Sequence, residues 1–443
     1  MSWIDQYRSK VMTAREAVSC VESGMRVYIH ASCAEPEALV EALMVRAPFV
    51  KDVEVMHILT TGASPYCMPE MAEHFRHNAL FVGGNVREAV NDGRADYTPI
   101  FLGEIEGLFE NGEMPIDVAF IQVSPPDSHG YCSFGVGVEC TLTAAKYAHR
   151  VVAQVNTQMP RTYGDSFIHV SDIDTIVELS RPLCELKVQP GSELFSAIGR
   201  QVASLIDDGS VLQCGIGAIP DAILLSLMDR KDLGVHTELI SDSAIPLIEA
   251  GVINGQRKNF KPRKVILGFV LGTKKLFDFI DENPVFEFHP SAYTNDPFRI
   301  AQNHRMVAIN SAIEVDLTGQ VCAESIGPNF YSGFGGQLDF IRGAARSKWG
   351  KPIIALPSTA KNETMSRIVP RLANGAGVLT TRADVHYVVT EHGVAYLHGK
   401  TVRQRAEALI QVAHPKFHNE LFDYCERQRW FQRNAYVEAA VQG

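Results

Sequence analysis

Short runs of apolar residues alternate with amphipathic segments along the whole chain. A short apolar run bounded by turn residues is typical of a buried strand, and apolar residues three or four positions apart are typical of a helix. Because both kinds of segment alternate in each half, the pattern predicts an α/β protein with open, mostly parallel sheets and flanking helices. The expected strands are 27–30, 53–59, 80–82, 118–123, 151–155 and 175–178 in the first half, and 211–214, 235–240, 264–269, 306–310, 353–356 and 385–389 in the second.

An internal repeat divides the chain into two similar halves. Residues 22–43 and residues 207–227 share one order of features: a glycine turn, a short apolar strand, a loop, and a proline that opens an amphipathic helix. Further along, an apolar strand followed by an Asp-x-x-Gly turn occurs at Asp127 and again at Asp316. The repeat predicts two similar α/β domains that arose by duplication.

Proline and glycine cluster between residues 181 and 191, ahead of a new helical segment. Such a cluster is typical of the join between two domains. We therefore expect an N-terminal domain over residues 1–185, on the carboxylate-binding side, and a C-terminal domain over residues 190–443.

Composition and charge narrow the function. The chain has 443 residues, 46% of them apolar and 21% charged, enough for two globular domains of about 200 residues each. A formal net charge of −10 gives no support for binding a nucleic-acid backbone. The sequence shows neither a signal peptide nor an apolar run of the roughly eighteen residues that span a membrane. Nine scattered cysteines without a Cys-x-x-Cys pair indicate free thiols. We expect a cytoplasmic protein that binds neither nucleic acid nor membrane.

Glu238 is the candidate for catalysis. It lies in the apolar run 235–240, where a carboxylate is poorly solvated, and two glycine turns lie elsewhere in the same half, at 215–217 and 333–336. Glycine turns bring backbone N–H groups close to a ligand, so the three stretches outline a carboxylate nucleophile with an oxyanion site. A solvent-facing glutamate at a sheet edge is the alternative that the spacing leaves open.

Other chemistries find less support. No glycine turn completes G-x-G-x-x-G or a P-loop, and the G-x-S-x-G motif of serine hydrolases is absent. His74 and His77, in an expected helix, and His392 and His398 lack further ligands at a familiar spacing, so we predict no metal. Asp339 follows a glycine turn, where a polar side chain can position a ligand, but it is equally well explained as the N-cap of the following helix.

Four stretches of the second half carry a resemblance to a known family: GIGAIP at 215–220, HTELISD at 236–242, GFGGQLDF at 333–340 and IALPSTA at 354–360. Together with QVSPPD at 122–127 in the first half, they resemble the acetyl-CoA hydrolase/transferase family. These proteins are class I coenzyme A transferases, and the similarity is closest to the 4-hydroxybutyrate and butyryl-CoA:acetate branch. It extends over nearly the whole chain.

The resemblance implies two domains of the class I CoA-transferase fold, a homodimer, and a ping-pong transfer of CoA between a short-chain acyl-CoA and a carboxylate such as acetate. Acyl-CoA is then a substrate, and no cofactor is bound permanently. Glu238 matches the family's nucleophile, which carries CoA as a thioester. The resemblance also assigns oxyanion donors to Ile216, Gly217 and Gly335, substrate binding to Ser64 and Gln213, and CoA binding to Gly215, Asn310, Gly333, Gly335 and Gly336.

Two other functions stay open. An acyl-CoA hydrolase would use water in place of the acceptor carboxylate, and a non-catalytic homologue would only bind CoA or an acyl ligand. An intact glutamate between two intact glycine turns favours an enzyme over the second alternative.

Overall fold

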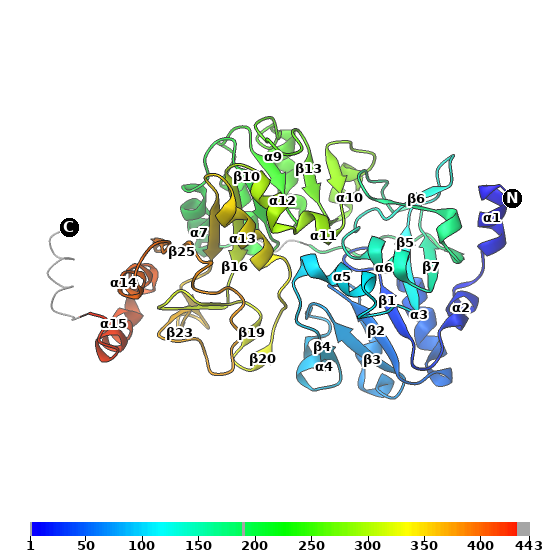
Figure 1. Cartoon of the computed structure of the whole chain (residues 1–443), viewed down its shortest axis with the longest axis horizontal. Helices are drawn as coiled ribbons and strands as arrows, with labels where there is room; N and C mark the ends of the chain where they lie inside the picture. Colours follow the sequence, from blue (N-terminus) through cyan, green and yellow to red (C-terminus); the bar gives the residue numbers. More distant parts are fainter. Residues whose placement is uncertain (1, 188–190, 432–443) are drawn as a thin grey trace.

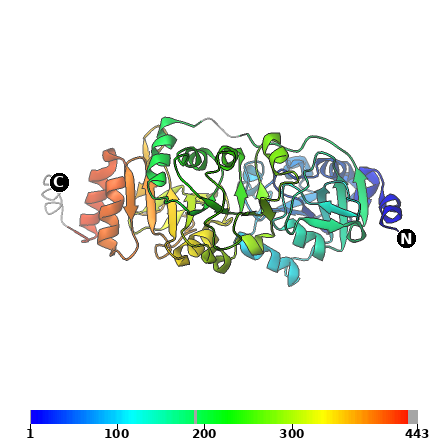
Figure 2. The ribbon, with the colours of Figure 1, turned by 90° about the horizontal axis from the view of Figure 1, so that it is seen from above.

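A computed structural model describes residues 2–187 and 191–431 of the chain. Two α/β halves lie along its longest axis, with helix α1 (Trp3–Lys10) at one end and helix α15 (His418–Arg427) at the other (Figure 1). The view from above, in Figure 2, shows the same elongated arrangement.

The first half contains a seven-stranded sheet in which all neighbouring strands are parallel. Its strand order is β4 (Asp96–Tyr97), β3 (Phe75–Ala79), β2 (Val53–His57), β1 (Arg26–Ile29), β5 (Val118–Val123), β7 (Arg150–Val155) and β9 (Thr175–Glu178).

The second half contains an eight-stranded sheet, parallel except for its last strand. Its strand order is β15 (Phe286–Phe288), β13 (Val265–Leu267), β11 (Gly234–His236), β10 (Val211–Cys214), β16 (Met306–Ser311), β21 (Lys351–Ala355), β25 (Tyr387–Thr390) and the antiparallel β26 (Gly393–Tyr396).

The two sheets are connected in the same way. In each, the first strand of the sheet in chain order lies inside it, the next strands follow outward on one side, and the later strands follow on the other side. The turns at Asp127 and Asp316 also agree: each Oδ1 accepts the backbone N–H groups two and four residues further on, at 2.8 and 3.0 Å in the first and 2.9 and 3.0 Å in the second. The predicted fold class of two similar, mostly parallel α/β halves is confirmed.

Helices cover both faces of each sheet. Strand side chains alternate between the two faces, so the apolar residues of one strand pack against helices on both sides. In β1, Val27 and Ile29 pack into the cluster that contains helix α3 (Glu37–Arg46), and Tyr28 packs into the cluster that contains α5 (Ile105–Glu110). No helix in the described ranges is long and apolar enough to cross a membrane. The other helices are α2 (Ala14–Ala17), α4 (Arg87–Asn91), α6 (Thr141–Tyr147), α7 (Glu193–Ala203), α8 (Ala218–Leu225), α9 (Ile245–Glu249), α10 (Lys274–Ile280), α11 (Ser291–Thr294), α12 (Pro297–Gln302), α13 (Gln337–Arg346) and α14 (Val402–Val412).

Two predicted strands of the second half are each broken in the structure. The run 235–240 forms β11 and then β12 (Leu239–Ile240), and the run 264–269 forms β13 and then β14 (Phe269–Val270). β12 and β14 pair with each other outside the large sheet. The remaining short strands are β6 (Tyr131–Ser133), β8 (Phe167–His169), β17 (Glu314–Asp316), β18 (Val321–Cys322), β19 (Ser325–Ile326), β20 (Asn329–Phe330), β22 (Thr359–Ala360), β23 (Met365–Ser366) and β24 (Ile368–Val369).

Two expectations for the first half are wrong. A strand is expected at 80–82, but the observed strand β3 covers Phe75–Ala79 and ends before that apolar run. β3 begins directly after His74, so His77 lies in this strand and not in a helix.

Backbone hydrogen bonds join the two halves beside these broken strands. The stretch 136–138 of the first half runs along β14: Val270 N–H donates to Val136 O at 2.9 Å, and Val138 N–H donates to Gly268 O at 2.9 Å. Elsewhere Leu102 N–H donates to Gly335 O at 3.0 Å. The two halves are thus held together next to Gly335 and next to the paired strands β12 and β14.

Candidate active site

Glu238 lies in the break between β11 and β12, where the chain leaves the large sheet. Its backbone carbonyl accepts the N–H groups of Gly268 at 2.8 Å and Phe269 at 3.1 Å, which fixes the main chain at the break. In open α/β sheets, ligands bind at the carboxyl ends of the strands. Glu238 follows Thr237 just beyond the carboxyl end of β11 and stands at that edge.

Two neighbours contact the Glu238 carboxylate. Asn295, which follows α11, donates its Nδ2–H to Glu238 Oε2 at 3.2 Å. Gly336 approaches so closely that a Cβ there would overlap both Glu238 Oε2 and Asn295 Nδ2, so the contact requires glycine. Because Gly336 is the N-cap of α13, the positive end of that helix faces the carboxylate.

Burial raises the pKa of Glu238, and the Asn295 amide and the Gly336 backbone N–H lower it without reversing the shift. A carboxylate with little hydration is a better nucleophile than one in water. The donors already in place can stabilise negative charge as it moves onto a neighbouring oxygen in the transition state. The arrangement is therefore suited to attack on a carbonyl carbon.

A second carboxyl group lies behind the first. Asp339, in the first turn of α13, is buried, and its Oδ2 accepts Gly103 N–H at 3.3 Å and Asn295 Nδ2–H at 3.5 Å. One amide thus bridges Glu238 and Asp339. Burial raises the pKa of Asp339 to about 8, with a smaller contribution from the charge of Glu238. Near neutral pH the Asp339 carboxyl is therefore mostly protonated, which limits the negative charge beside Asn295.

This pair predicts a bell-shaped pH profile. Activity is expected to fall at low pH, as Glu238 is protonated, and again above pH 8, as Asp339 ionises beside Glu238. At pH 9, roughly nine in ten molecules carry the second charge, so a loss approaching tenfold is expected if that form is inactive. Asp339→Asn should keep the rate at pH 7 and remove the high-pH limb, as measured by kcat/KM from pH 5 to 10.

The exposed Asp278, which pairs with Lys274 on the surface of α10, provides the matched control. Asp278→Asn should leave the whole profile unchanged. An unaltered high-pH limb in Asp339→Asn would contradict the assignment of that limb to Asp339.

Glu238 lies where two cavities of about 500 Å³ each meet. The apolar cavity is formed by both halves, and the polar cavity is formed almost entirely by the second half. Besides Glu238, the apolar cavity is lined chiefly by Ile58, Leu59, Leu80, Ile100, Leu102, Ile105, Leu239 and Phe269. Besides Glu238, the polar cavity is lined chiefly by Asn310, Ser311, Gly333, Gly336, Gln337 and Arg367.

Most of the residues predicted from the sequence lie around this junction. Ile216 and Gly335 line both cavities, Gly215 lines the apolar one, and Asn310, Gly333 and Gly336 line the polar one. Gly217 has a φ of 110° and serves as the N-cap of α8 without lining either cavity.

The two predicted substrate-binding residues lie further back. Gln213 is buried in β10, where its Oε1 accepts Asn310 Nδ2–H at 3.1 Å and holds that side chain in the polar cavity. Ser64 is buried, and its Oγ accepts Asn85 Nδ2–H at 2.8 Å and Tyr66 O–H at 3.1 Å. Ser64 lines neither cavity, and its part in substrate binding stays a prediction.

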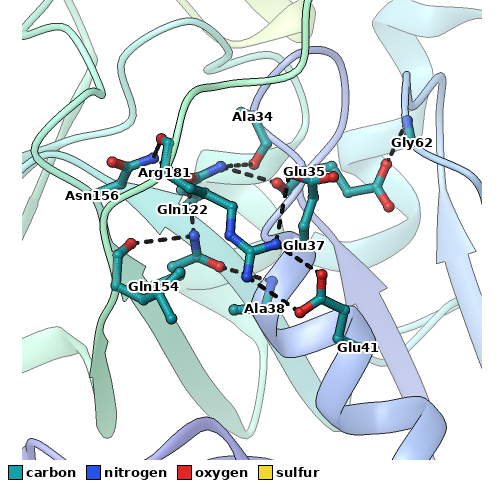
Figure 3. A network of polar contacts seen from close by, with 11 residues as sticks. Ala34, Glu35, Glu37, Ala38, Glu41, Gly62, Gln122, Gln154, Asn156 and Arg181 are labelled. Carbon is teal, nitrogen blue, oxygen red and sulfur yellow. Dashed lines mark hydrogen bonds and ion pairs between the residues drawn. The ribbon is translucent and has the colours of Figure 1, made fainter.

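The corresponding edge of the first sheet is occupied by side-chain amides (Figure 3). Gln122 donates to Ala34 O at 3.1 Å and Glu35 O at 3.0 Å, and its Oε1 accepts Asn156 Nδ2–H at 2.7 Å. Glu35 accepts Gly62 N–H at 2.9 Å, and burial raises the pKa of Glu35 to about 7. These groups bond to one another, whereas Glu238 in the second half opens onto cavities.

Sequence reasoning missed Asn295 and the first-half lining of the apolar cavity. Asn295 belongs to no glycine turn and no apolar strand, so no local pattern marked it. Among residues 2–187 and 191–431, no group of three His, Cys, Asp or Glu side chains converges as metal ligands would.

Two family models match the chain. The one described as the acetyl-CoA hydrolase/transferase N-terminal domain matches residues 1–183, and the one described as the C-terminal domain of the same family matches residues 272–425.

Individual proteins are similar over nearly the full length. A 4-hydroxybutyrate coenzyme A transferase of Clostridium kluyveri is 53% identical over 96% of this chain and 99% of its own. A succinyl-CoA:acetate/propanoyl-CoA:succinate CoA transferase of Fasciola hepatica is 50% identical over 92% of this chain and 85% of its own. The crystal structure of RipA from Yersinia pestis is 36% identical, with a TM-score of 0.92 over 97% of this chain and 100% of that one.

Proposed function

The chain belongs to the acetyl-CoA hydrolase/transferase family and is a CoA-transferase acting between short-chain acyl-CoA and carboxylates, and we propose that it works through a thioester between CoA and Glu238. The observation that carries this proposal is the position of the Glu238 carboxylate, in contact with Asn295 and Gly336 where the two cavities meet.

The reaction begins when a Glu238 carboxylate oxygen attacks the thioester carbonyl carbon of the acyl-CoA. The tetrahedral intermediate collapses with loss of CoA thiolate, which leaves a mixed anhydride between the acyl group and Glu238. The thiolate then attacks the glutamyl carbonyl and expels the first carboxylate, so CoA is now bound to Glu238. A second carboxylate repeats these steps in reverse, restores Glu238 and leaves as the new acyl-CoA.

Backbone N–H groups around Glu238 stabilise the oxyanions of these steps. Gly336 N–H already faces the carboxylate, and the family resemblance adds the amides of Ile216, Gly217 and Gly335. Such donors are most effective where water is excluded. One thioester is exchanged for another, so the reaction needs no ATP, and the proposal includes no permanently bound cofactor.

The two cavities divide the substrate. We assign the pantetheine arm of CoA to the polar cavity, where Asn310, Arg367 and the turn at 333–336 offer hydrogen bonds, and the acyl chain to the apolar cavity. Ser64 and Gln213 remain in the proposal as residues that support the substrate site.

The proposal also keeps a compartment and an oligomeric state. All nine cysteines are free, in keeping with a reducing compartment such as the cytoplasm, and the homodimer is kept from the family resemblance.

The direct test is the intact mass of the protein after brief incubation with acetyl-CoA or butyryl-CoA. We expect an adduct with the mass of CoA less one water, as a thioester requires, that disappears when excess acetate is added and that borohydride converts to a reduced Glu238. Free CoA released without an acceptor, and without any adduct, would instead indicate a hydrolase. Neither adduct nor turnover would indicate a protein that only binds CoA.

A further inference from the structure

The lining of the apolar cavity is almost entirely hydrocarbon. Leu59, Leu80 and Ile100 lie among a nearly continuous hydrocarbon surface contributed by the first half, and Leu239 and Phe269 close it from the second. Of the described residues that line it, none is lysine, arginine or histidine, and the only carboxylate is Glu238. Polar side chains are limited to Tyr331 and Ser332, which line the polar cavity as well.

The size of this cavity exceeds what an acetyl group needs. Its volume is about 500 Å³, whereas a water molecule takes up about 30 Å³ in the liquid and a methylene group is of similar size. The three carbons of a butyryl chain beyond its carbonyl thus occupy about 90 Å³ on the same scale. There is room for longer, branched or cyclic hydrocarbon groups.

The charges around the cavity argue against a second carboxylate on the substrate. Arg367 lines the polar cavity and not the apolar one. Arg87 does not line the apolar cavity either, because it is held against Tyr331. It stacks on the Tyr331 ring, with 3.8 Å from its guanidinium carbon to the ring centroid, and donates its Nε–H to Tyr331 O at 2.8 Å. A carboxylate at the end of a four-carbon chain would face leucine and isoleucine, and an unpaired charge in such surroundings is strongly disfavoured.

We propose that this enzyme prefers apolar monocarboxylates of four carbons or more, branched and cyclic ones included, over acetate as the acid that it exchanges, and that dicarboxylates are excluded by the lining of the apolar cavity. The proposal rests on the proposed function, because it requires the acyl chain to enter this cavity. It separates this chain from its relative in Fasciola hepatica, whose name includes succinate.

The first test is a chain-length series in the transfer assay, with acetate, butyrate, hexanoate, cyclohexanecarboxylate and succinate as acceptors. Each buried methylene should raise kcat/KM by about fourfold until the cavity is full. Butyrate and succinate have four carbons each and differ in charge, so their ratio measures the discrimination. We expect butyrate to be favoured by at least about a hundredfold, and a preference for acetate or succinate would overturn the proposal.

The second test places a cation in the cavity. Leu59 is only partly buried, so Leu59→Arg can be accommodated, and it should raise kcat/KM for succinate relative to butyrate by at least about tenfold. Leu225, which is 66% exposed at the end of α8, gives the matched control Leu225→Arg, whose ratio should not change. An unchanged ratio in folded Leu59→Arg would contradict the proposal.

A third variant carries the test if Leu59→Arg does not fold. Ile100→Phe fills part of the cavity and should lower the preference for hexanoate over butyrate by several-fold, with an unchanged ratio counting against the proposal. The CoA adduct separates the two levels of inference. An adduct that forms while the series favours acetate or succinate would remove this proposal and leave the proposed function standing, whereas no adduct with any acyl-CoA would remove both.

Discussion

Replacing Glu238 by alanine is expected to lower kcat/KM for CoA transfer by about 10⁴-fold or more, because the variant has no group to carry CoA between the two substrates. The adjacent Asn295 and Gly336 can still hold an oxyanion, but they cannot form the thioester. The rate is measured with butyryl-CoA and acetate, and the intact mass of the variant should show no CoA adduct.

Two further variants make this result specific. Glu238→Asp withdraws the carboxylate by one methylene, and a displacement of about 1 Å in a reacting group can cost about a hundredfold. Glu193, exposed on the surface of α7, is the matched control, and Glu193→Ala should retain full activity. Because the charged form of Glu238 is disfavoured by burial, Glu238→Ala should not lower the thermal midpoint. Substantial activity in Glu238→Ala would show that the nucleophile lies elsewhere.

The repeat in the sequence was a sound guide to the architecture, because glycine turns, helix-opening prolines and Asp-x-x-Gly turns are local features that keep their spacing in a duplicated fold. The strand β3 shows where an apolar run misleads. Its side chains alternate, with Phe75, His77 and Ala79 buried and Arg76 exposed between them, so the strand has the period of two without being apolar. The apolar residues at 80–82 follow it and include Leu80 and Phe81 of the cavity.

Glu238 could be selected from sequence, but the break that presents it could not. The run 235–240 reads as one strand, and the interruption arises because Gly268 and Phe269, far along the chain, both donate to Glu238 O. Asn295 reaches Glu238 for a similar reason, through the packing of α11 against the first half. The apolar cavity depends on both halves, so which leucines line it follows from docking and not from any local pattern.

The same docking distinguishes the half that carries the proposed nucleophile from the other half. In the first half, the amides of Gln122, Gln154 and Asn156 bond to one another and to the backbone at the corresponding sheet edge. In the second half, the edge at Glu238 is completed by side chains of the first half, Leu59 and Ile100 among them. In the proposed mechanism, one half thus provides the reacting group and the other provides much of the surface around the acyl chain.

Gly336→Ala tests whether the close approach of the backbone to Glu238 is essential. The residue has φ −97° and ψ 6°, which alanine adopts without strain, so the substitution acts through the contact and not through the main chain. The new methyl group would overlap Glu238 Oε2 and Asn295 Nδ2 and force the carboxylate away from both donors. Loss of a single oxyanion donor costs about 10²- to 10³-fold in kcat. We expect kcat for transfer and the rate of CoA-adduct formation to fall together by that factor, at an unchanged thermal midpoint.

Gly84→Ala is the matched control for Gly336→Ala, since a Cβ at Gly84 meets nothing within 4 Å. Full activity in Gly336→Ala would mean that Glu238 reacts without its contact to α13, and the oxyanion donors would then have to be sought at Ile216 and Gly217.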